Sequence, residues 1–446
     1  MVHRRRGGGH PIPRRPAVAA RPRGAAVPPT RTPGGCEVSV STLPAVPPCS
    51  RTKAAVGRMI IRRALDRLPL QVRMGRAELL GRGGPAMAVH DPAAFERRIT
   101  AEGLIGFGES YVAGEWDARD PVAVLTVLAG HVEALVPAPL QRLRGLWAAR
   151  HPTLERNTPD GSRSNIRRHY DLSNELFGEF LDPTMTYSSA VFRALPASWK
   201  ELPAAQHRKI DMLLDLAQVG PDTRLLEIGT GWGELALRAA RRGARVVTLT
   251  LSHEQRELAL RRIAAAGLED RVEVRLCDYR EATGQYDAVV SVEMIEAVGA
   301  EYWPVYFATL DRLLAPGGRV ALQAITMPHE RMLATKDTYT WIQKYIFPGG
   351  MLPSVQVIEE MARAHTGLRV TRCEGYGAHY AQTLRLWRER FAERADRVAA
   401  LGFDETFRRM WTFYLAYCEA GFASGYLDVH QILLTGAGGR DGGERE

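Results

Sequence analysis

The chain has 446 residues, of which 45% are hydrophobic and 24% charged, with a formal net charge of +9. This length and composition exclude a largely disordered or fibrous chain and predict roughly two to three globular domains. The sequence has neither a run of about 18 uncharged apolar residues, as a membrane-spanning helix requires, nor the apolar core of a signal peptide. Its five cysteines form no CxxC pair, so we expect no disulfide framework, no metal site and a reducing, cytoplasmic location.

The positive charge is concentrated at the N-terminus. Residues 1–60 carry ten arginines and one lysine against a single glutamate, so the rest of the chain is nearly neutral. Residues 1–54 are rich in Pro, Arg and Gly and bury little apolar surface, which predicts disorder there, as it does for residues 436–446. The tail is interpreted as a solvated segment without a specific role, as an upstream start-site artefact, or as a segment attracted to anionic phospholipid. Nucleic-acid binding is disfavoured because no aromatic residues are interleaved with the arginines.

Residues 55–150 show helical patterning that is broken at 81–85 and 137–139. This patterning predicts a smaller, mainly helical N-terminal domain. No catalytic-looking group of residues occurs in this stretch. Residues 151–165 are polar and contain Pro, Gly, Asn and Asp, which indicates a linker.

From residue 166 to about 435, strands alternate regularly with helical segments. Such alternation predicts an α/β domain with a mostly parallel sheet. An aromatic-rich insertion at about 326–366 interrupts the pattern and is expected to cover an active site. The expected strands are Arg224–Ile228, Arg245–Thr250, Val272–Leu276, Ala288–Val292 and Arg319–Ile325, and the expected helices are Glu234–Arg242, His253–Ala266 and Tyr302–Leu314.

The first of these strands ends in Glu227 and runs into three alternating glycines, Gly229, Gly231 and Gly233. A strand, a glycine loop and a helix form the unit with which open α/β sheets hold nucleotides. The spacing differs from the dinucleotide GxGxxG pattern and resembles the first motif of S-adenosyl-L-methionine (SAM) methyltransferases. A different nucleotide, or a glycine turn without a ligand, is the alternative.

Polar residues after the second strand are candidates for binding the SAM ribose. Many SAM enzymes place an acid here, whereas this chain offers Thr250, Leu251 and then Gln255. A hydroxyl and an amide can still bind ribose hydroxyls. Ser252 is expected to cap the following helix.

Acidic residues follow the third and fourth strands. Asp278 is expected to accept a hydrogen bond from the adenine amino group while Tyr279 stacks on the ring, although a loop turn would also explain the Asp. Glu293 and Glu296 lie where the sheet opens onto substrate, and either could bind a cation, act as a base or hold another group. Both are also candidates for capping a helix, Glu293 more so than Glu296.

Segments around the glycine loop carry a more specific signal. The sequence HYDLSNELF at 169–177 leads to FLDPTMTYSSA at 180–190, and GAHYAQTLRLW follows at 377–387. Together with the TLS, DYR and IE segments in the same order, they resemble the cyclopropane-fatty-acyl-phospholipid synthase family, which includes the mycolic acid cyclopropane synthases. The resemblance covers about residues 55–435 and is strongest over 165–435.

The resemblance implies a class I SAM methyltransferase domain, Rossmann-like, with a seven-stranded sheet, and an N-terminal domain that presents lipid. The implied reaction methylates the cis double bond of an unsaturated phospholipid acyl chain, and a bound bicarbonate removes the proton. Tyr187 and Ser188 are expected at the cofactor. The bicarbonate ligands map onto the backbone of Ser189 and the side chains of Glu296, Gln323 and Tyr380.

Two of these positions depart from the family pattern. Ser189 replaces a cysteine, and Gln323 replaces a histidine and cannot relay a proton. The simplest predicted product is a cyclopropane. Loss of a proton after a hydride shift would instead give a 10-methylene chain, which a reductase partner would saturate.

The predicted protein is an enzyme at the inner face of the membrane, with a homodimer left open. The aromatic stripe at 404–424 would line an acyl tunnel or form ordinary core. A nucleic-acid or small-molecule methyltransferase, and a SAM-binding protein without turnover, are the alternatives from other classes. No nucleic-acid partner is expected.

Overall fold

The computed structural model describes residues 45–131, 157–158, 161 and 173–436. The predictions made for residues 1–44, for most of the linker at 151–165 and for 437–446 fall outside the described residues. Within the described ranges, none of the helices combines the length and apolar character that crossing a membrane requires.

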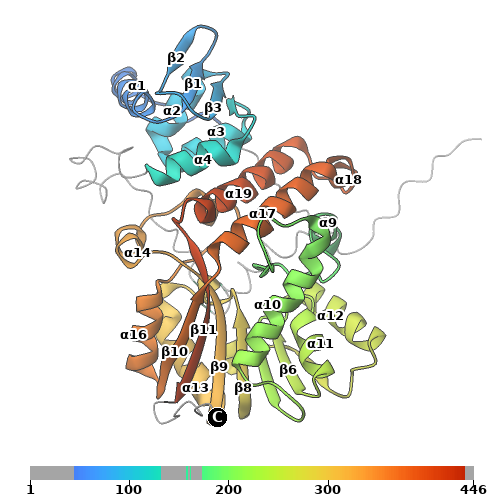
Figure 1. Cartoon of the computed structure of the whole chain (residues 1–446). Coiled ribbons are helices and arrows are strands. Elements are labelled where there is room, and N and C mark those ends of the chain that lie inside the picture. The colour runs from blue at the N-terminus through green and yellow to red at the C-terminus, as the bar shows by residue number, and fades with distance from the viewer. Residues whose placement is uncertain (1–44, 132–156, 159–160, 162–172, 437–446) are drawn as a thin grey trace, which may run out of the picture. The chain divides into compact units, whose positions relative to one another are not determined.

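A seven-stranded sheet forms the centre of the larger domain (Figure 1). Its order is β10-β11-β9-β8-β5-β6-β7, and β11 is antiparallel to both of its neighbours. The five predicted strands are confirmed, with β8 and β9 beginning earlier than expected. The bounds are β5 Arg224–Ile228, β6 Arg245–Thr250, β7 Val272–Leu276, β8 Tyr286–Val292, β9 Leu314–Thr326, β10 Leu368–Gly375 and β11 Asp428–Gly436.

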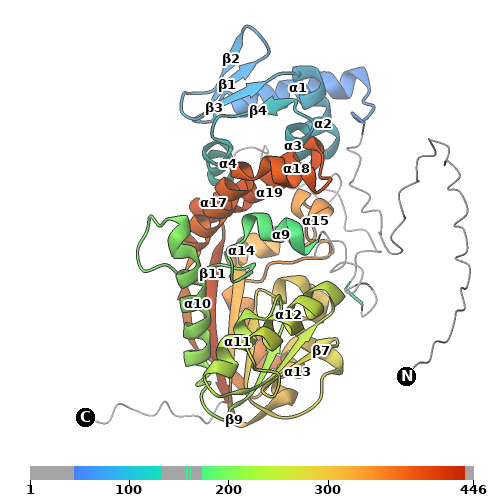
Figure 2. The same ribbon diagram turned by 90° about the vertical axis from the view of Figure 1, so that its right-hand side faces the viewer.

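Helices cover both faces of this sheet (Figures 1 and 2). Successive strand residues point to opposite faces, so Leu225 packs in the core beneath α10 and α11 while Leu226 packs in the core beneath α13. Burial on both faces explains why the inner strands β5 and β8 are mostly apolar. The helices are α10 (Leu202–Leu216), α11 (Glu234–Arg241) and α12 (His253–Ala265) on one face, and α13 (Trp303–Leu313) and α16 (Val355–His365) on the other.

The predicted insertion at 326–366 is shorter than expected. Because α16 packs on α13 and β10, residues 355–365 belong to the covering layer of the sheet. The interruption itself holds α14 (His329–Thr335) and α15 (Trp341–Tyr345).

The N-terminal domain contains a sheet that the helical patterning missed. Its strands are arranged β2-β1-β3-β4, and all four lie in the stretch predicted to be helical. Val72 and Met74 are buried while their neighbours are exposed, a period-two pattern that favours a strand but is too short to stand out. The elements are α1 (Arg51–Leu65), β1 (Gln71–Met74), β2 (Glu78–Leu80), β3 (Ala86–Val89), α2 (Pro92–Glu102), α3 (Leu104–Val112), β4 (Trp116–Asp117) and α4 (Pro121–Gly130).

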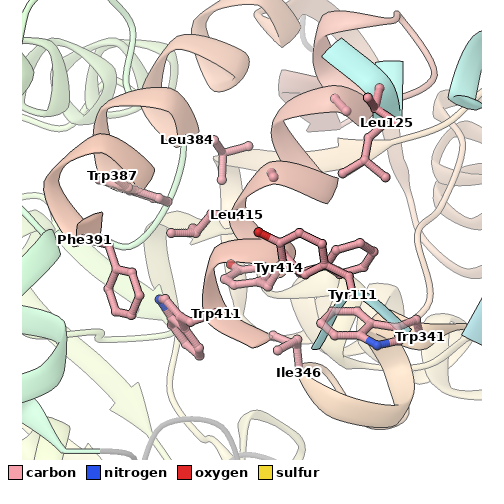
Figure 3. Close-up of a cluster of buried hydrophobic side chains, with 14 of the residues drawn as sticks. Tyr111, Leu125, Trp341, Ile346, Leu384, Trp387, Phe391, Trp411, Tyr414 and Leu415 are labelled. Carbon is pink, nitrogen blue, oxygen red and sulfur yellow. The ribbon is translucent and has the colours of Figure 1, made fainter. Parts of the chain in front are cut away.

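An aromatic core joins the N-terminal elements to α9 (Asn174–Phe180), α17 (Gly377–Glu393), α18 (Ala395–Ala400) and α19 (Glu405–Ala423). Figure 3 shows part of it, with Tyr414 and Trp411 of α19 among residues of α3, α4, α15 and α17. The predicted helix at 404–424 is confirmed, and part of its aromatic stripe is core: Trp411 and Tyr414 are buried, with ring centroids 5.1 Å apart, whereas Tyr417 is exposed. Arg409 donates hydrogen bonds to the carbonyl of Tyr111 at 2.9 and 2.7 Å.

A glycine lets α15 approach α3. A Cβ at Gly108 would lie 2.4 Å from Cδ1 of Trp341. Two charge-assisted contacts reinforce this packing, because Lys344 and Tyr345 both reach one carboxylate oxygen of Glu109, at 2.7 and 2.6 Å.

We predict that Gly108→Ala lowers the free energy of unfolding by about 1–3 kcal/mol, since the ring of Trp341 must move. Gly178→Ala is the matched control: it also lies inside a helix, but nothing stands within 4 Å of an added Cβ. Replacing that glycine should raise stability by up to about 1 kcal/mol. Urea unfolding of both variants measures the difference, and equal effects would contradict the close packing.

Candidate active site

The carboxyl ends of the parallel strands meet at one edge of the sheet, where β5 passes into the glycine loop. Gly229, Gly231 and Gly233 have φ values of 101°, 51° and 89°, which favour glycine, and Gly233 then begins α11. Glu227, the predicted acid before the loop, is 3% exposed. Burial raises the pKa of its carboxyl to about 8. The loop therefore has the backbone conformation that lets a nucleotide approach closely.

The residues predicted at the ribose lie beside this loop. Thr250 donates to Oε1 of Gln255 at 2.9 Å, which joins the end of β6 to the first turn of α12. Ser252 accepts from the backbone N–H of Gln255 at 3.2 Å, so its predicted role as a helix cap is confirmed. Leu251 is partly exposed between them.

Asp278, predicted at the adenine, is buried and already has a partner. Its Oδ1 accepts from the backbone N–H of Arg280 at 3.0 Å, and the guanidinium of Arg280 donates to both carboxylate oxygens, at 2.8 and 2.6 Å. The loop-turn interpretation therefore describes these contacts, and the adenine contact stays a prediction. Tyr279 packs edge-on against Tyr306, with ring centroids 5.5 Å apart.

Three of the four predicted anion-binding positions converge on one carboxylate, that of Glu293. Its Oε1 accepts from the backbone N–H of Ser189 at 2.9 Å and from Nε2 of Gln323 at 2.8 Å. Its Oε2 accepts from the hydroxyl of Tyr380 at 2.6 Å. We call these three donors the anion cup. The helix-capping interpretation of Glu293 is wrong for its side chain, because none of its partners is the start of a following helix.

Glu296, the predicted fourth ligand, is not bonded to these donors. One of its oxygens accepts from the backbone N–H of Ile325, and the other has no hydrogen-bond partner among the described residues. Burial raises the pKa of Glu296 to about 8, and the nearby charge of Glu293 adds to the shift. The structure thus brings two carboxylates together and gives only Glu293 the predicted donors.

The sequence interpretation missed a buried lysine. Lys209 on α10 is 1% exposed, and its Nζ donates to Oγ of Ser188 at 2.5 Å. Burial lowers the pKa of Lys209 to about 8, against the opposing effect of Glu293. The sequence does contain a signal for this burial, because Lys209 lies four residues after Ala205 and four before Leu213, on the apolar face of its helix.

Gln431 on β11 was also missed, since nothing in its local sequence marks it. Its Nε2 donates to Oε1 of Gln323 at 3.1 Å and to the backbone carbonyl of Lys209 at 3.1 Å. It therefore orients the amide of Gln323, so that the NH₂ group points to Glu293.

Aromatic rings line the side of the cup nearest α17 and α19. The hydroxyls of Tyr187 and Tyr414 lie 2.5 Å apart, and the ring centroids of Tyr380 and Phe422 lie 4.5 Å apart. Electron-rich ring faces of this kind stabilise positive charge in a dry site.

We predict that Glu296→Gln changes the pH dependence of stability. The pKa of this carboxyl is about 8 in the folded protein against 4.5 for an ordinary glutamate. Between these values the unfolded chain releases a proton that the folded protein keeps, so the stability of the wild type falls as pH rises. The variant, which has no such proton, should gain on the order of 2 kcal/mol relative to the wild type between about pH 5.5 and 7.5.

Urea unfolding at both pH values measures this gain. Glu269→Gln, an exposed carboxylate ahead of β7, is the control and should change stability by less than about 0.5 kcal/mol at either pH. A constant difference for Glu296→Gln would show that this carboxyl is ionised in the folded protein throughout the window.

The chain is similar to known proteins over most of its length. A family model described as mycolic acid cyclopropane synthetase matches residues 157–432. The chain is 56% identical over 398 residues to the tuberculostearic acid methyltransferase UfaA1 of Mycobacterium tuberculosis, covering 88% of this chain and 93% of that protein. It is 35% identical over 372 residues to the cyclopropane-fatty-acyl-phospholipid synthase of Escherichia coli K12, covering 80% and 92%.

Solved structures extend the likeness to the fold. The cyclopropane synthase MmaA2 of Mycobacterium tuberculosis matches with a TM-score of 0.56 at 32% identity, covering 61% of this chain and 98% of that one. The mycolic acid cyclopropane synthase CmaA1, complexed with SAH and CTAB, matches with a TM-score of 0.56 at 32% identity, covering 64% and 99%. The predicted class I methyltransferase fold is confirmed, and the chain belongs to the mycolic acid cyclopropane synthetase family of SAM-dependent methyltransferases.

Proposed function

We propose that the protein methylates the cis double bond of an unsaturated fatty acyl chain and that the product is a methylene-branched chain. The observation that carries this proposal is the 56% identity, over 88% of the chain, to a protein named for tuberculostearic acid, a methyl-branched fatty acid. The identity to the Escherichia coli cyclopropane synthase is 35%. The cyclopropane expected from the sequence becomes the second candidate product.

The residues at the sheet edge suit SAM. A buried acid, a glycine loop with positive φ and the polar ends of β6 and β7 offer partners for its amino acid, ribose and adenine groups. When bound, SAM supplies the methyl group. The anion cup, in contrast, does not suit bicarbonate as the sequence suggested, because its three donors already hold the Glu293 carboxylate. Bicarbonate therefore has no part in this proposal.

The two products share the first step and differ in the second. The alkene carbon forms a bond to the incoming methyl group, which leaves a positive charge on the neighbouring chain carbon. In the methylene route a hydride moves to that carbon from the carbon that received the methyl group, which then carries the positive charge. A proton then leaves the new methyl group, and its bonding pair forms the double bond. In the cyclopropane route that proton leaves without the hydride shift. The rings of Tyr187 and Tyr380 would stabilise the cation in either case.

The acyl chain is proposed to belong to a phospholipid at a membrane surface, which the N-terminal domain presents. The arginine-rich tail supports this setting through its charge. A methylene product would require a separate reductase that supplies hydride to give the saturated methyl branch.

We predict that the purified protein, given SAM and vesicles of oleoyl phosphatidylglycerol, forms S-adenosylhomocysteine and a fatty acid one CH₂ heavier than oleate. Proton NMR should show the vinylic signal of a C=CH₂ branch and not the upfield signals of a cyclopropane ring. Mass alone cannot decide, since the two products are isomers. Upfield ring signals would assign the cyclopropane instead, and no lipid product would reject both.

Deleting residues 1–44 tests the alternative that the basic tail recruits the protein to nucleic acid as its methylation substrate. The truncated protein should retain turnover in detergent-dispersed lipid. Turnover that depends on the tail and on added nucleic acid would favour the other class.

A further inference from the structure

Glu293 stands at a backbone position that favours glycine. Its φ is 49°, in the left-handed region where a side chain with a Cβ costs free energy. The residue directly follows β8, and its backbone N–H donates to the carbonyl of Gln323 at 2.7 Å, so the strand pairing fixes this conformation. Non-glycine residues persist in such conformations where the surrounding structure holds them, and they concentrate at functional sites.

The side chain is held as firmly as the backbone. Glu293 accepts from Ser189, Gln323 and Tyr380, which come from three segments distant in sequence. Three donors on a planar O–C–O group are the arrangement that a bound bicarbonate or formate would need. A buried carboxylate fills that arrangement from within the chain.

The surroundings make the Glu293 carboxylate a stronger base than a glutamate in water, because burial raises its pKa. The three hydrogen bonds and the cation of Lys209 lower the pKa of Glu293, whereas burial raises it by more. A base in a dry site needs this balance, because a carboxylate in water is too weak to hold a proton.

Resting on the function proposed above, we infer that Glu293 is the base: its carboxylate accepts the proton that leaves the new methyl group. The C–H bonding pair becomes the second bond of the C=CH₂ group of the methylene product, and the proton ends on a carboxylate oxygen of Glu293. One proton leaves for each methyl transferred, so the charge balances without an external base. The residue thereby replaces the bicarbonate expected from the family resemblance.

The first test removes bicarbonate. The wild-type protein, assayed with SAM and oleoyl phosphatidylglycerol vesicles in buffer freed of CO₂, should form product at the rate seen with added bicarbonate. Glu293→Gln keeps the shape of the side chain but cannot accept the proton, and its rate of product formation should fall by about 100-fold or more. Its affinity for SAM, measured by calorimetry, should remain within about threefold, and Glu269→Gln should keep the wild-type rate.

The second test removes the Glu293 carboxylate from the three donors of the anion cup. Glu293→Gly suits the positive φ and removes the carboxylate that accepts from Ser189, Gln323 and Tyr380. Bicarbonate or formate should raise the melting temperature of this variant in a saturable manner and leave that of the wild type unchanged. Added bicarbonate should also restore part of its product formation.

The outcomes separate this inference from the proposed function. If the wild type forms no lipid product, the proposed function fails, and the melting-temperature experiment still decides whether Glu293 fills an anion site. A bicarbonate requirement in the wild type, full activity of Glu293→Gln, or no stabilisation of Glu293→Gly by either anion would each overturn the assignment of Glu293 as the base.

Discussion

The convergence of three donors on the Glu293 carboxylate is the interaction on which the candidate active site depends. The backbone N–H of Ser189, the amide of Gln323 and the hydroxyl of Tyr380 come from the loop after α9, from β9 and from α17. An unpaired buried carboxylate is costly, so these segments gain stability by meeting at this point. The carboxyl edge of the sheet is thereby joined to the helices that carry the aromatic core.

That aromatic core gives the site its environment. The paired hydroxyls of Tyr187 and Tyr414 join the site to α19, and α19 packs in turn on α3 and α4 of the N-terminal domain. Because the rings exclude water, each hydrogen bond and charge in the cup acts at a lower dielectric than at the surface. The packing that stabilises the two domains therefore also strengthens the hydrogen bonds and charge interactions in the anion cup.

Local patterns in the sequence predicted the fold well and the site in part. The bounds of β5, β6 and β7 were predicted to the residue, because these strands alternate regularly with helical segments along the chain. The strands at 71–89 are too short for their alternation to outweigh the helical patterning around them. The family resemblance indicated Ser189, Gln323 and Tyr380, but not that they face Glu293. Glu293 and Glu296 differ by one turn of chain, and the positive φ that directs Glu293 into the cup depends on strand pairing.

The left-handed backbone conformation at Glu293 also indicates one way in which such a site can evolve. A position with φ of 49° accepts glycine without strain, and the codons of glycine and glutamate can differ by a single base. A protein that holds a diffusible anion between the same three donors would thus lie one nucleotide substitution from a protein that carries the anion on its own chain. The exchange would leave the strand, the donors and the fold unchanged, and it would release the reaction from the supply of dissolved carbonate.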